Sequence, residues 1–415
     1  MENELTNNPS VSVPKHLIEY KYNEYSIQII RWILKAINAW PRPADISIVE
    51  KIHSDFARFM CYFLIIAVMV PNGLSMFLDK QLPYADKLQN FGPFTFWAIA
   101  IVNYSCLLIH IDDIRDCVEH VKVDWRIIKG LEDRKVMLKT ARLGRFFAGF
   151  CAVFMHCGVF SYNIVQGTLK TALQMENGSV TVRTLPYPFY HKILNAYYSP
   201  AYECVFFMQF LSSFIVNSVT VATCSLAAVF VMHACGQIKI MISWLENFID
   251  NRNEEGTSMR QKYAIIVNHH LRIISFVSRI EKIMNIICLV ELLGCTMHIC
   301  CLGYYCMMDY FSGDKRSILS HGMVLCSITF NIFIFCYIGE ILSEQGEQIG
   351  KSAYMTNWHL LPGKSAQGII LIILRSNTVL KITAGKIVQL SFATFGDVIK
   401  SALAYLNMLR TILVL

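Results

Sequence analysis

Charged side chains are scarce in this sequence. Of its 415 residues only 16% are Asp, Glu, Lys or Arg, whereas soluble domains carry about 25%. Common enzyme signatures are missing too, since the chain contains no GxGxxG, no phosphate-binding GxxxxGK, no HExxH and no GxSxG. We therefore expect neither an enzyme nor a bound cofactor.

The sequence is instead rich in hydrophobic residues, which make up 54% of the chain. The alternating segments of about ten residues that build membrane β-barrels do not occur. The composition therefore predicts an all-α integral membrane protein. The formal net charge of +7 is not gathered on one basic face, so we expect no nucleic-acid partner.

Cysteine is frequent, with 15 residues, but it forms no CxxC pair. Most of these cysteines lie inside apolar runs, which is typical of small buried hydrophobic side chains. A disulfide framework is not expected in a chain of this length, and the spacing of a zinc site is missing. We expect no metal site.

Seven segments are long and apolar enough to cross a bilayer, which takes about 20 residues. We expect seven transmembrane helices, of which the last is the weakest. The predicted spans are 56–78, 91–111, 146–168, 202–235, 284–308, 322–342 and 387–410.

The loops between these spans predict the orientation of the chain. Lys and Arg together number nine between spans two and three and seven between spans four and five, against two or three after spans one, three and five. Basic loops stay in the cytoplasm, so we expect a cytoplasmic N-terminus and an extracellular C-terminus. Asn177 starts a glycosylation acceptor in a loop placed outside, whereas a second acceptor at Asn103 lies within span two. No cleaved signal peptide is evident.

Span four indicates a cytoplasmic helical layer. It carries no Asp, Glu, Lys or Arg from Cys204 to Ile238, about 50 Å of helix against roughly 30 Å of hydrocarbon. Residues 262–282 and 17–40 are amphipathic and add to such a layer. The predicted divisions are a cytoplasmic segment (1–55), spans one to four with a ligand pocket (56–240), a cytoplasmic helical loop (241–283), spans five and six (284–342), an anchor segment (343–386) and a pore helix with its outer end (387–415).

The C-terminal tail is apolar yet contains several ions. A charge at the centre of a lipid-facing helix costs about 2.5–3.5 kcal/mol, so either the tail is not a span or it is shielded by protein and lines something wet. Asp397 and Lys400, three residues apart, lie on one face of the final helix and can reach water or each other. We interpret that face as the wall of a pore between subunits.

A small apolar pocket is predicted among the outer halves of spans two, three, four and six. Aromatic, Met and small polar residues there provide apolar contacts and orienting groups, although ordinary helix packing accounts for each one singly. Glu291, inside span five, is either functional or a group that pairs within the bundle. The candidate ligand-binding residues are Phe94, Trp97, Phe160, Tyr162, Met208, Ser213, Met323 and Ser327.

The C-terminal residues also form a recognisable pattern. It comprises Ser352, Ala353, Tyr354, Asn357, Trp358, Leu361, Pro362, Arg375, Ser376, Thr383, Ala384, Gly385, Lys386, Leu390, Ser391, Phe395, Lys400, Ser401, Tyr405, Leu409 and Arg410. With Arg31-Trp32-Ile33-Leu34 and Trp40-Pro41 ahead of span one, this pattern closely resembles the insect odorant receptor family. His359 and Ala393 depart from residues common there, which indicates a divergent odour-tuning subunit and not the family's co-receptor.

This resemblance implies a heterotetrameric, ligand-gated, non-selective cation channel formed with the co-receptor. It places Met408 at or near the apolar gate and Thr411 near the outer mouth. The ligand would be a small volatile apolar molecule, and the location the plasma membrane of olfactory sensory neuron dendrites. A gustatory receptor of the same superfamily, a G-protein-coupled receptor and a transporter are the alternatives. The tail motifs weigh against a gustatory receptor, and the inside N-terminus weighs against a G-protein-coupled receptor. The lack of internal repeats weighs against a transporter.

Overall fold

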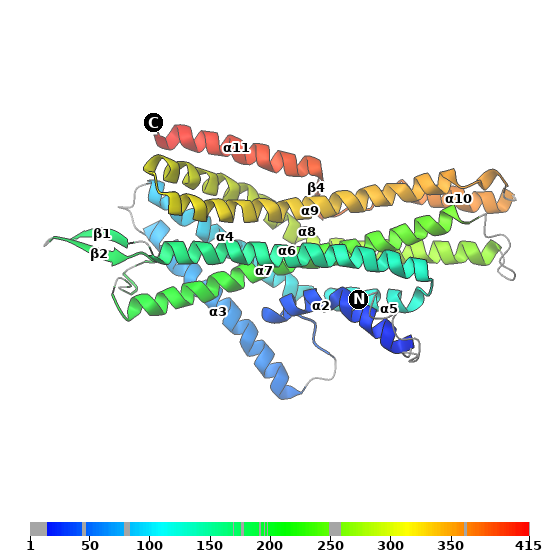
Figure 1. Ribbon diagram of the computed structural model, residues 1–415, viewed down its shortest axis with the longest axis horizontal. Coiled ribbons are helices and arrows are strands. Elements are labelled where there is room, and N and C mark those ends of the chain that lie inside the picture. The colour runs from blue at the N-terminus through cyan, green and yellow to red at the C-terminus, as the bar shows by residue number, and fades with distance from the viewer. Residues whose placement is uncertain are drawn as a thin grey trace, which may run out of the picture.

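The computed structural model describes residues 15–43, 47–78, 84–168, 170–175, 178–190, 192–194, 196, 198–248, 259–360 and 363–414. Asn177 and the loop 249–258 lie outside these residues. The described chain is an elongated bundle of long helices (Figure 1). A hairpin of β1 and β2 lies at the same end as the C-terminus, and α10 lies at the opposite end.

The helices account for most of the described residues. They are α2 (Lys15–Ala36), α3 (Ile48–Leu78), α4 (Tyr84–Ile109), α5 (Ile111–Ile127), α6 (Leu131–Thr168), α7 (Ala201–Glu246), α8 (Met259–Ser312), α9 (Lys315–Met355), η2 (Trp358–Leu360), α10 (Gly363–Ser376) and α11 (Phe392–Val414). The strands form two antiparallel pairs, β1 (Lys170–Met175) with β2 (Gly178–Arg183) and β3 (Thr383–Ala384) with β4 (Val388–Gln389).

Six of the described helices are long and apolar enough to cross a membrane. They correspond to predicted spans one to six and are α3, the part Asn90–Ile109 of α4, α6, α7, α8 and α9. On α3, Phe56, Phe59, Phe63 and Ile66 are exposed along one face, as expected where a helix contacts lipid. The seventh predicted span forms α11, 23 residues long, which carries Asp397, Lys400 and Arg410 and is not among the six.

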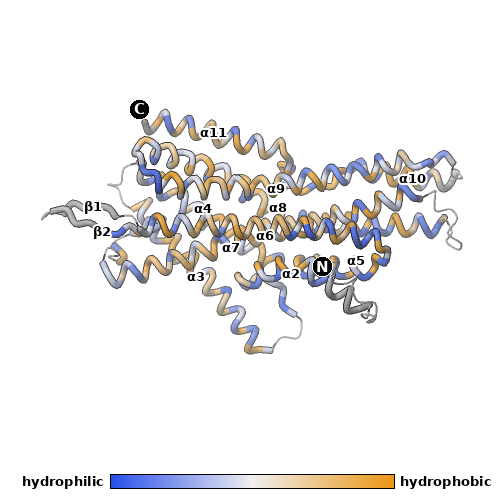
Figure 2. Tube along the Cα trace, viewed as in Figure 1, coloured by the Kyte–Doolittle hydropathy of each residue, from blue (hydrophilic) through white to orange (hydrophobic). Residues whose placement is uncertain are grey.

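The long helices continue past the predicted span limits. The predicted loop 241–283 is largely helical, because α7 runs on to Glu246 and α8 is continuous from Met259 to Ser312. The predicted boundary at 342/343 falls inside α9. Hydrophobic residues dominate the half of the bundle nearest the hairpin of β1 and β2, and hydrophilic residues become more frequent toward α10 (Figure 2). The structure thus contains a bundle with a helical layer at one end.

Helix α7 lies at the centre of the core. Every side chain from Val216 to Ile238 is buried, and α6, α8 and α9 pack around it. A helix without charges on any face is stable where neighbours cover all its faces. Most of the uncharged stretch that predicted an unusually long span is therefore the central helix of the bundle.

The predicted amphipathic stretch before span one forms α2, which packs on α5, α6 and α7. Ile27, Ile30 and Leu34 are fully buried at helical spacing. The Tyr104 hydroxyl donates to the Ile37 carbonyl at 2.9 Å, which ties the end of α2 to α4. The stretch is thus a packed element of the layer.

A buried ionic cluster joins α5, α7 and α8 in this layer. The Asp124 carboxylate pairs with His233 Nε2 at 2.8 Å and accepts a hydrogen bond from Arg272. His120, one turn earlier, stacks on Phe276 with ring centroids 4.7 Å apart. Burial lowers the pKa of His120 to about 4. Burial alone would raise the pKa of Asp124, but the hydrogen bond to His233 and the charges around it lower it overall.

A small hairpin precedes the last helix, which therefore begins at Phe392 and not at residue 387 as predicted. Gly385 and Lys386 have φ of 64° and 59°, and the Ile387 N–H donates to the Ala384 carbonyl at 3.1 Å. Two successive positive φ values are typical of a type I′ turn. Residue 387 belongs to this turn and residues 388–389 form β4, so α11 cannot begin at 387.

The hairpin is held between α8 and α9. The Glu281 carboxylate accepts hydrogen bonds from the Thr383 N–H, at 2.8 Å, and from its hydroxyl. A Cβ atom at Gly339 in α9 would lie 2.5 Å from the Leu390 carbonyl oxygen, so only glycine permits this approach. The start of α11 is thereby fixed to both neighbouring helices.

Candidate ligand cavity and pore helix

A cavity of about 90 Å³ lies inside the bundle. Its lining comes from α4, α6, α7, α8 and α9 together with the loop after β2. Predicted spans two, three, four and six all contribute, and α8, which is span five, contributes as well. For comparison, an apolar cavity of about 150 Å³ binds benzene. This cavity therefore suits a molecule of few heavy atoms, and a larger one requires side chains to move.

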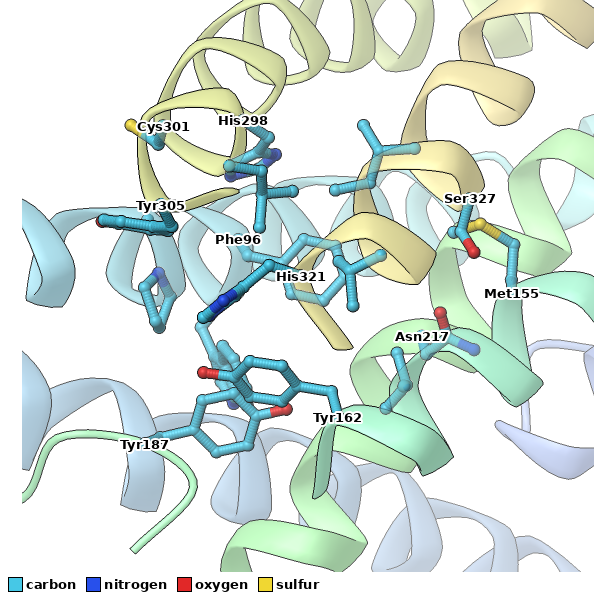
Figure 3. A pocket seen from close by; sticks show the side chains of 17 residues that line it. Phe96, Met155, Tyr162, Tyr187, Asn217, His298, Cys301, Tyr305, His321 and Ser327 are labelled. Carbon is cyan, nitrogen blue, oxygen red and sulfur yellow. The ribbon is translucent and has the colours of Figure 1, made fainter. Parts of the chain in front are cut away.

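Aromatic rings form much of the wall (Figure 3). Tyr162 stands 5.5 Å from Tyr187 and 5.7 Å from His321, measured between ring centroids. His321 is in turn 5.5 Å from Tyr305. Such rings provide large apolar contact area with few rotatable bonds. The wall is therefore suited to flat or compact apolar molecules.

Tyr187 reaches the cavity from a loop that α7 fixes in place. The buried Gln209 amide donates to the Tyr187 carbonyl at 2.9 Å and accepts from its N–H at 3.2 Å. The Tyr162 hydroxyl donates to the Pro186 carbonyl at 3.2 Å. Trp97, whose ring contacts Tyr187 at 4.6 Å, donates from its indole nitrogen to Ser212 at 2.8 Å. These contacts hold Tyr187 in the wall of the cavity.

Most polar atoms of the lining are already paired. His298 Nε2 lies 3.1 Å from the Thr95 hydroxyl, and His321 Nδ1 lies 2.7 Å from the Asp309 carboxylate. The Tyr305 hydroxyl donates to the Leu88 carbonyl at 2.6 Å. Asn217 differs, because neither end of its fully buried amide has a hydrogen-bond partner among the described residues. Its amide is the group of the wall most in need of a partner.

Three of the eight predicted ligand-binding residues line this cavity, namely Trp97, Tyr162 and Ser327. Ser327 already donates to the Met323 carbonyl at 2.8 Å, so it presents little free hydrogen-bonding capacity. These three lie on α4, α6 and α9. Their role in binding a ligand remains a prediction.

The other five predicted residues lie outside the lining. Phe94 packs against Gly73 of α3, and Phe160 is 55% exposed on the outer side of α6. Met208 packs beside the loop after β2. Ser213 accepts from the Asn163 amide at 3.1 Å, in the group that positions Tyr187. Met323 contributes its carbonyl to Ser327, one turn away. All eight predicted residues lie on helices that border the cavity, but these five are not in its lining, and a role in ligand binding stays a prediction for them as well.

Residues that sequence reasoning missed include Tyr187, Asn217, His298, Tyr305 and His321. Polar residues at 217, 298 and 321 inside apolar runs were the available signal. A histidine or asparagine in a span is costly unless it is paired or faces a cavity. Tyr187 gave no such signal, because its position depends on how the loop folds back.

Helix α11 lies at the edge of the bundle and contacts only α8 and α9 closely. Asp397 and Lys400 form an ion pair of 3.6 Å, with side chains 73% and 81% exposed. Met408 is 54% exposed, and Thr411 is also exposed and donates to the Asn407 carbonyl at 3.0 Å. Positions 397, 400, 404, 408 and 411 follow helical spacing, so the predicted pore residues share one open face.

The cysteines and Asn103 complete the account of the predicted sites. All fifteen cysteines are free thiols, and eleven of them are buried. In the part of the chain that the structure describes, no group of three or more His, Cys, Asp or Glu side chains is placed to hold a metal ion. Asn103 is buried against Glu291, so its acceptor sequence is inaccessible. Asn177 lies outside the described residues.

Comparison with known proteins decides the family. The sequence profile of the 7tm odorant receptor family matches residues 84–403. The chain belongs to this family. Odorant receptor 10 of Aedes albopictus is 24% identical over 232 residues, which cover 56% of this receptor and 61% of that relative. Odorant receptor 82a of Drosophila melanogaster is 24% identical over 262 residues, with 63% and 66% covered. The matches thus span about two thirds or less of each relative.

Solved odorant receptors share the fold. The structure of the olfactory receptor OR5 from Machilis hrabei in complex with eugenol matches with a TM-score of 0.75, covering 95% of this receptor and 99% of that chain. A second structure of the same receptor gives a TM-score of 0.74. Sequence identities of 14% and 16% mean that the likeness concerns the fold alone.

Proposed function

We propose that this receptor is the odour-tuning subunit of a heteromeric, ligand-gated, non-selective cation channel. A small volatile ligand binds in the cavity, and the change in its walls opens a pore lined by α11. The partner is a co-receptor subunit of the same family, and the assembly is a tetramer in the plasma membrane of olfactory sensory neurons. A gustatory role is the weaker alternative, since the matched family is that of odorant receptors.

The observation that carries this proposal is that α8 borders both the cavity and α11. Leu302 of α8 lines the cavity, and the next residue, Gly303, lies against Leu406 of α11. A Cβ atom at Gly303 would stand only 3.1 Å from the Leu406 side chain. A shift of α8 on ligand binding is therefore passed directly to α11. Such coupling requires that the ligand bind the open state more tightly than the closed one.

The open face of α11 supports its role as a pore wall. Asp397 and Lys400 are exposed in the single subunit, and burying these ions in lipid would be costly. Facing a shared aqueous pore removes that cost. The exposed apolar side chains Ile370, Leu371 and Leu374 of α10 offer a surface for neighbouring subunits at the other end of the bundle.

Recording currents from cells that express the receptor with the co-receptor tests this proposal. A panel of small volatile ligands should evoke a cation current that neither subunit alone produces to the same extent. Surface labelling controls for expression. Surface-expressed receptor that gives no current with any ligand in the panel would contradict the channel role.

A further inference from the structure

A second, much smaller cavity adjoins the ligand cavity deeper in the bundle. Its volume is about 10 Å³, the space of roughly one water molecule. Phe96, Met155, His298 and Ile328 line both cavities and so form the partition between them. Glu291 lies in the wall of the small cavity only.

Glu291 is an acid without a cationic partner. It is 3% exposed, and no Lys, Arg or His among the described residues forms an ion pair with it. Its carboxylate accepts instead from two amides, Asn103 Nδ2 at 2.6 Å and Asn331 Nδ2 at 2.9 Å. The Cys295 thiol adds a weak contact at 3.9 Å. Amide donors orient the carboxylate, but they do not neutralise a charge within the bundle.

The cluster has a surplus of hydrogen-bond acceptors. Both amide nitrogens donate to Glu291. The Oδ1 atoms of Asn103 and Asn331 are therefore left as acceptors, and neither has a donor among the described residues. Both side chains are almost fully buried, and Asn331 lines the small cavity. Rotating either amide by 180° would place its oxygen against the carboxylate, so the surplus persists. A group that offers only donors and carries a positive charge complements both the unpaired oxygens and the carboxylate.

The size of the cavity narrows the choice of that group. An ammonium head has about the volume of one water molecule and carries up to three N–H donors. Its carbon chain would pass the partition into the larger cavity. The rings of Phe96 and His298, 5.6 Å apart, stand along this route, and the face of an aromatic ring such as Phe96 attracts cations.

We propose that Glu291 and Asn331 form a subsite for the ammonium head of a protonated amine ligand whose apolar part occupies the main cavity. This inference rests on the proposed function, because it assumes that the main cavity is the ligand site. It assigns to this receptor a preference for small aliphatic amines over neutral molecules of the same shape.

Binding to the full-length receptor in lipid nanodiscs provides the test, with ligand-dependent thermal stabilisation as the readout. n-Pentylamine, which is protonated at pH 7, is compared with 1-pentanol, which has nearly the same shape. We expect the apparent affinity of wild-type receptor to be at least tenfold higher for the amine. Glu291→Gln should bring the ratio of amine affinity to alcohol affinity close to one, because the substitution removes the charge. Once one asparagine amide turns by 180°, its Oδ1 can accept from the new amide, which favours folding.

Two further variants control for indirect effects. Glu203→Gln removes an exposed carboxylate at the start of α7 and should leave the ratio unchanged. Asn331→Thr removes the unpaired amide oxygen but keeps a donor for Glu291, and it should lower the ratio in part. This variant keeps the proposal testable should Glu291→Gln fail to fold.

The contrary results are distinct. Equal binding of amine and alcohol to wild-type receptor, or an amine preference that survives in Glu291→Gln, would overturn the amine subsite and leave the ligand cavity standing. Stabilisation by Na⁺ relative to N-methylglucamine that Glu291→Gln removes, without any amine preference, would assign the site to an inorganic ion and overturn it as well. Binding of neither ligand would count against both the ligand cavity and the subsite.

Discussion

At the scale of single residues, Asn217 gives the ligand cavity its chemical character. An ordinary hydrogen bond contributes about 1 kcal/mol, whereas a buried polar group left unpaired costs about 1–3 kcal/mol. The amide of Asn217, unpaired among the described residues, therefore favours a ligand that carries a hydrogen-bonding group, or a water molecule that takes the place of such a group. The paired histidines and tyrosines around it contribute shape and apolar surface.

Replacing Asn217 by Leu removes this hydrogen-bonding group at similar volume. We expect the concentration of an alcohol needed for half-maximal current to rise about fivefold, the equivalent of about 1 kcal/mol. The response to a hydrocarbon of the same shape should be unchanged or stronger. Concentration–response curves for both ligands measure this, and a parallel loss for the two would show that the amide acts only on packing.

His120 and Asp124 make the stability of the helical layer sensitive to pH. The pKa of His120 is lowered to about 4, so the folded protein does not take up the proton that the unfolded chain binds near pH 6.5. The stability contributed by neutral His120 is complete above about pH 6.5 and declines as the pH falls toward 4. Asp124, whose pKa is also lowered, extends the loss to lower pH.

The thermal unfolding temperature of the solubilised receptor should therefore decrease between pH 7 and pH 4.5. Arg272 and Arg279, which surround His120, stay charged in this range and do not contribute to the slope. His233 lies against the carboxylate of Asp124. The variant His120→Gln removes one titrating group and should flatten the decrease, so an unaltered slope would exclude His120 as its source.

Single residues of the cavity were predictable only in part. Trp97 and Tyr162 combine a large apolar ring with a polar atom, and both were found from the sequence. Phe160 also has a large apolar ring but points outward, since a membrane helix can be apolar on its lipid face as well as on its core face. In a membrane helix, hydrophobic periodicity therefore does not distinguish the core face from the lipid face. Polar residues such as Asn217 and His298 do distinguish them, because they lie on the core face.

At the scale of elements, the hairpin of β3 and β4 determines where α11 starts. Its turn requires positive φ at Gly385, and a Cβ atom there would lie 2.9 Å from the Leu289 side chain. A residue other than glycine in this conformation costs about 1–3 kcal/mol. The hairpin connects the helical layer with the proposed pore helix. Strain that a substitution introduces at Gly385 should therefore affect gating as well as folding.

Gly385→Ala should lower the thermal stability of the receptor and shift the ligand concentration that opens the channel. Gly396→Ala is the matched control, because no neighbouring atom lies within 4 Å of its Cβ position in α11. Alanine is favoured over glycine inside a helix by about 1 kcal/mol, so this control should be neutral or stabilising. Equal effects of the two substitutions on unfolding temperature would argue against a special role of the turn.

The existence of each long helix was predictable, but the joints between helices were not. Uncharged length identified span four, and the structure explains it by complete burial from Val216 to Ile238. The start of α11 was placed too early, because Ile387 to Ser391 are as apolar as the helix that follows. Their use in a turn and a strand depends on Glu281 and Gly339, which are distant in sequence. Such long-range contacts leave no local signature.

At the scale of the whole molecule, the two ends of the bundle should lie on opposite sides of the membrane. The basic loops predict that the end carrying α2, α5 and α10 is cytoplasmic. An epitope tag at the N-terminus should be detected by antibody only after cells are permeabilised, and a tag at the C-terminus should be detected on intact cells. Labelling of the N-terminal tag on intact cells would reverse the orientation and contradict the proposed arrangement.

The central claim is that a ligand in the bundle cavity opens a pore lined by the exposed face of α11. Its most direct test is the relative permeability of the ligand-evoked current to cations of different size, recorded with the co-receptor for wild-type receptor, Met408→Ala and Lys400→Ala. If the claim holds, substitutions on this face change the permeability ratios or the conductance, while the same ligand still evokes current. Ratios and conductance identical to wild type in both variants would contradict it.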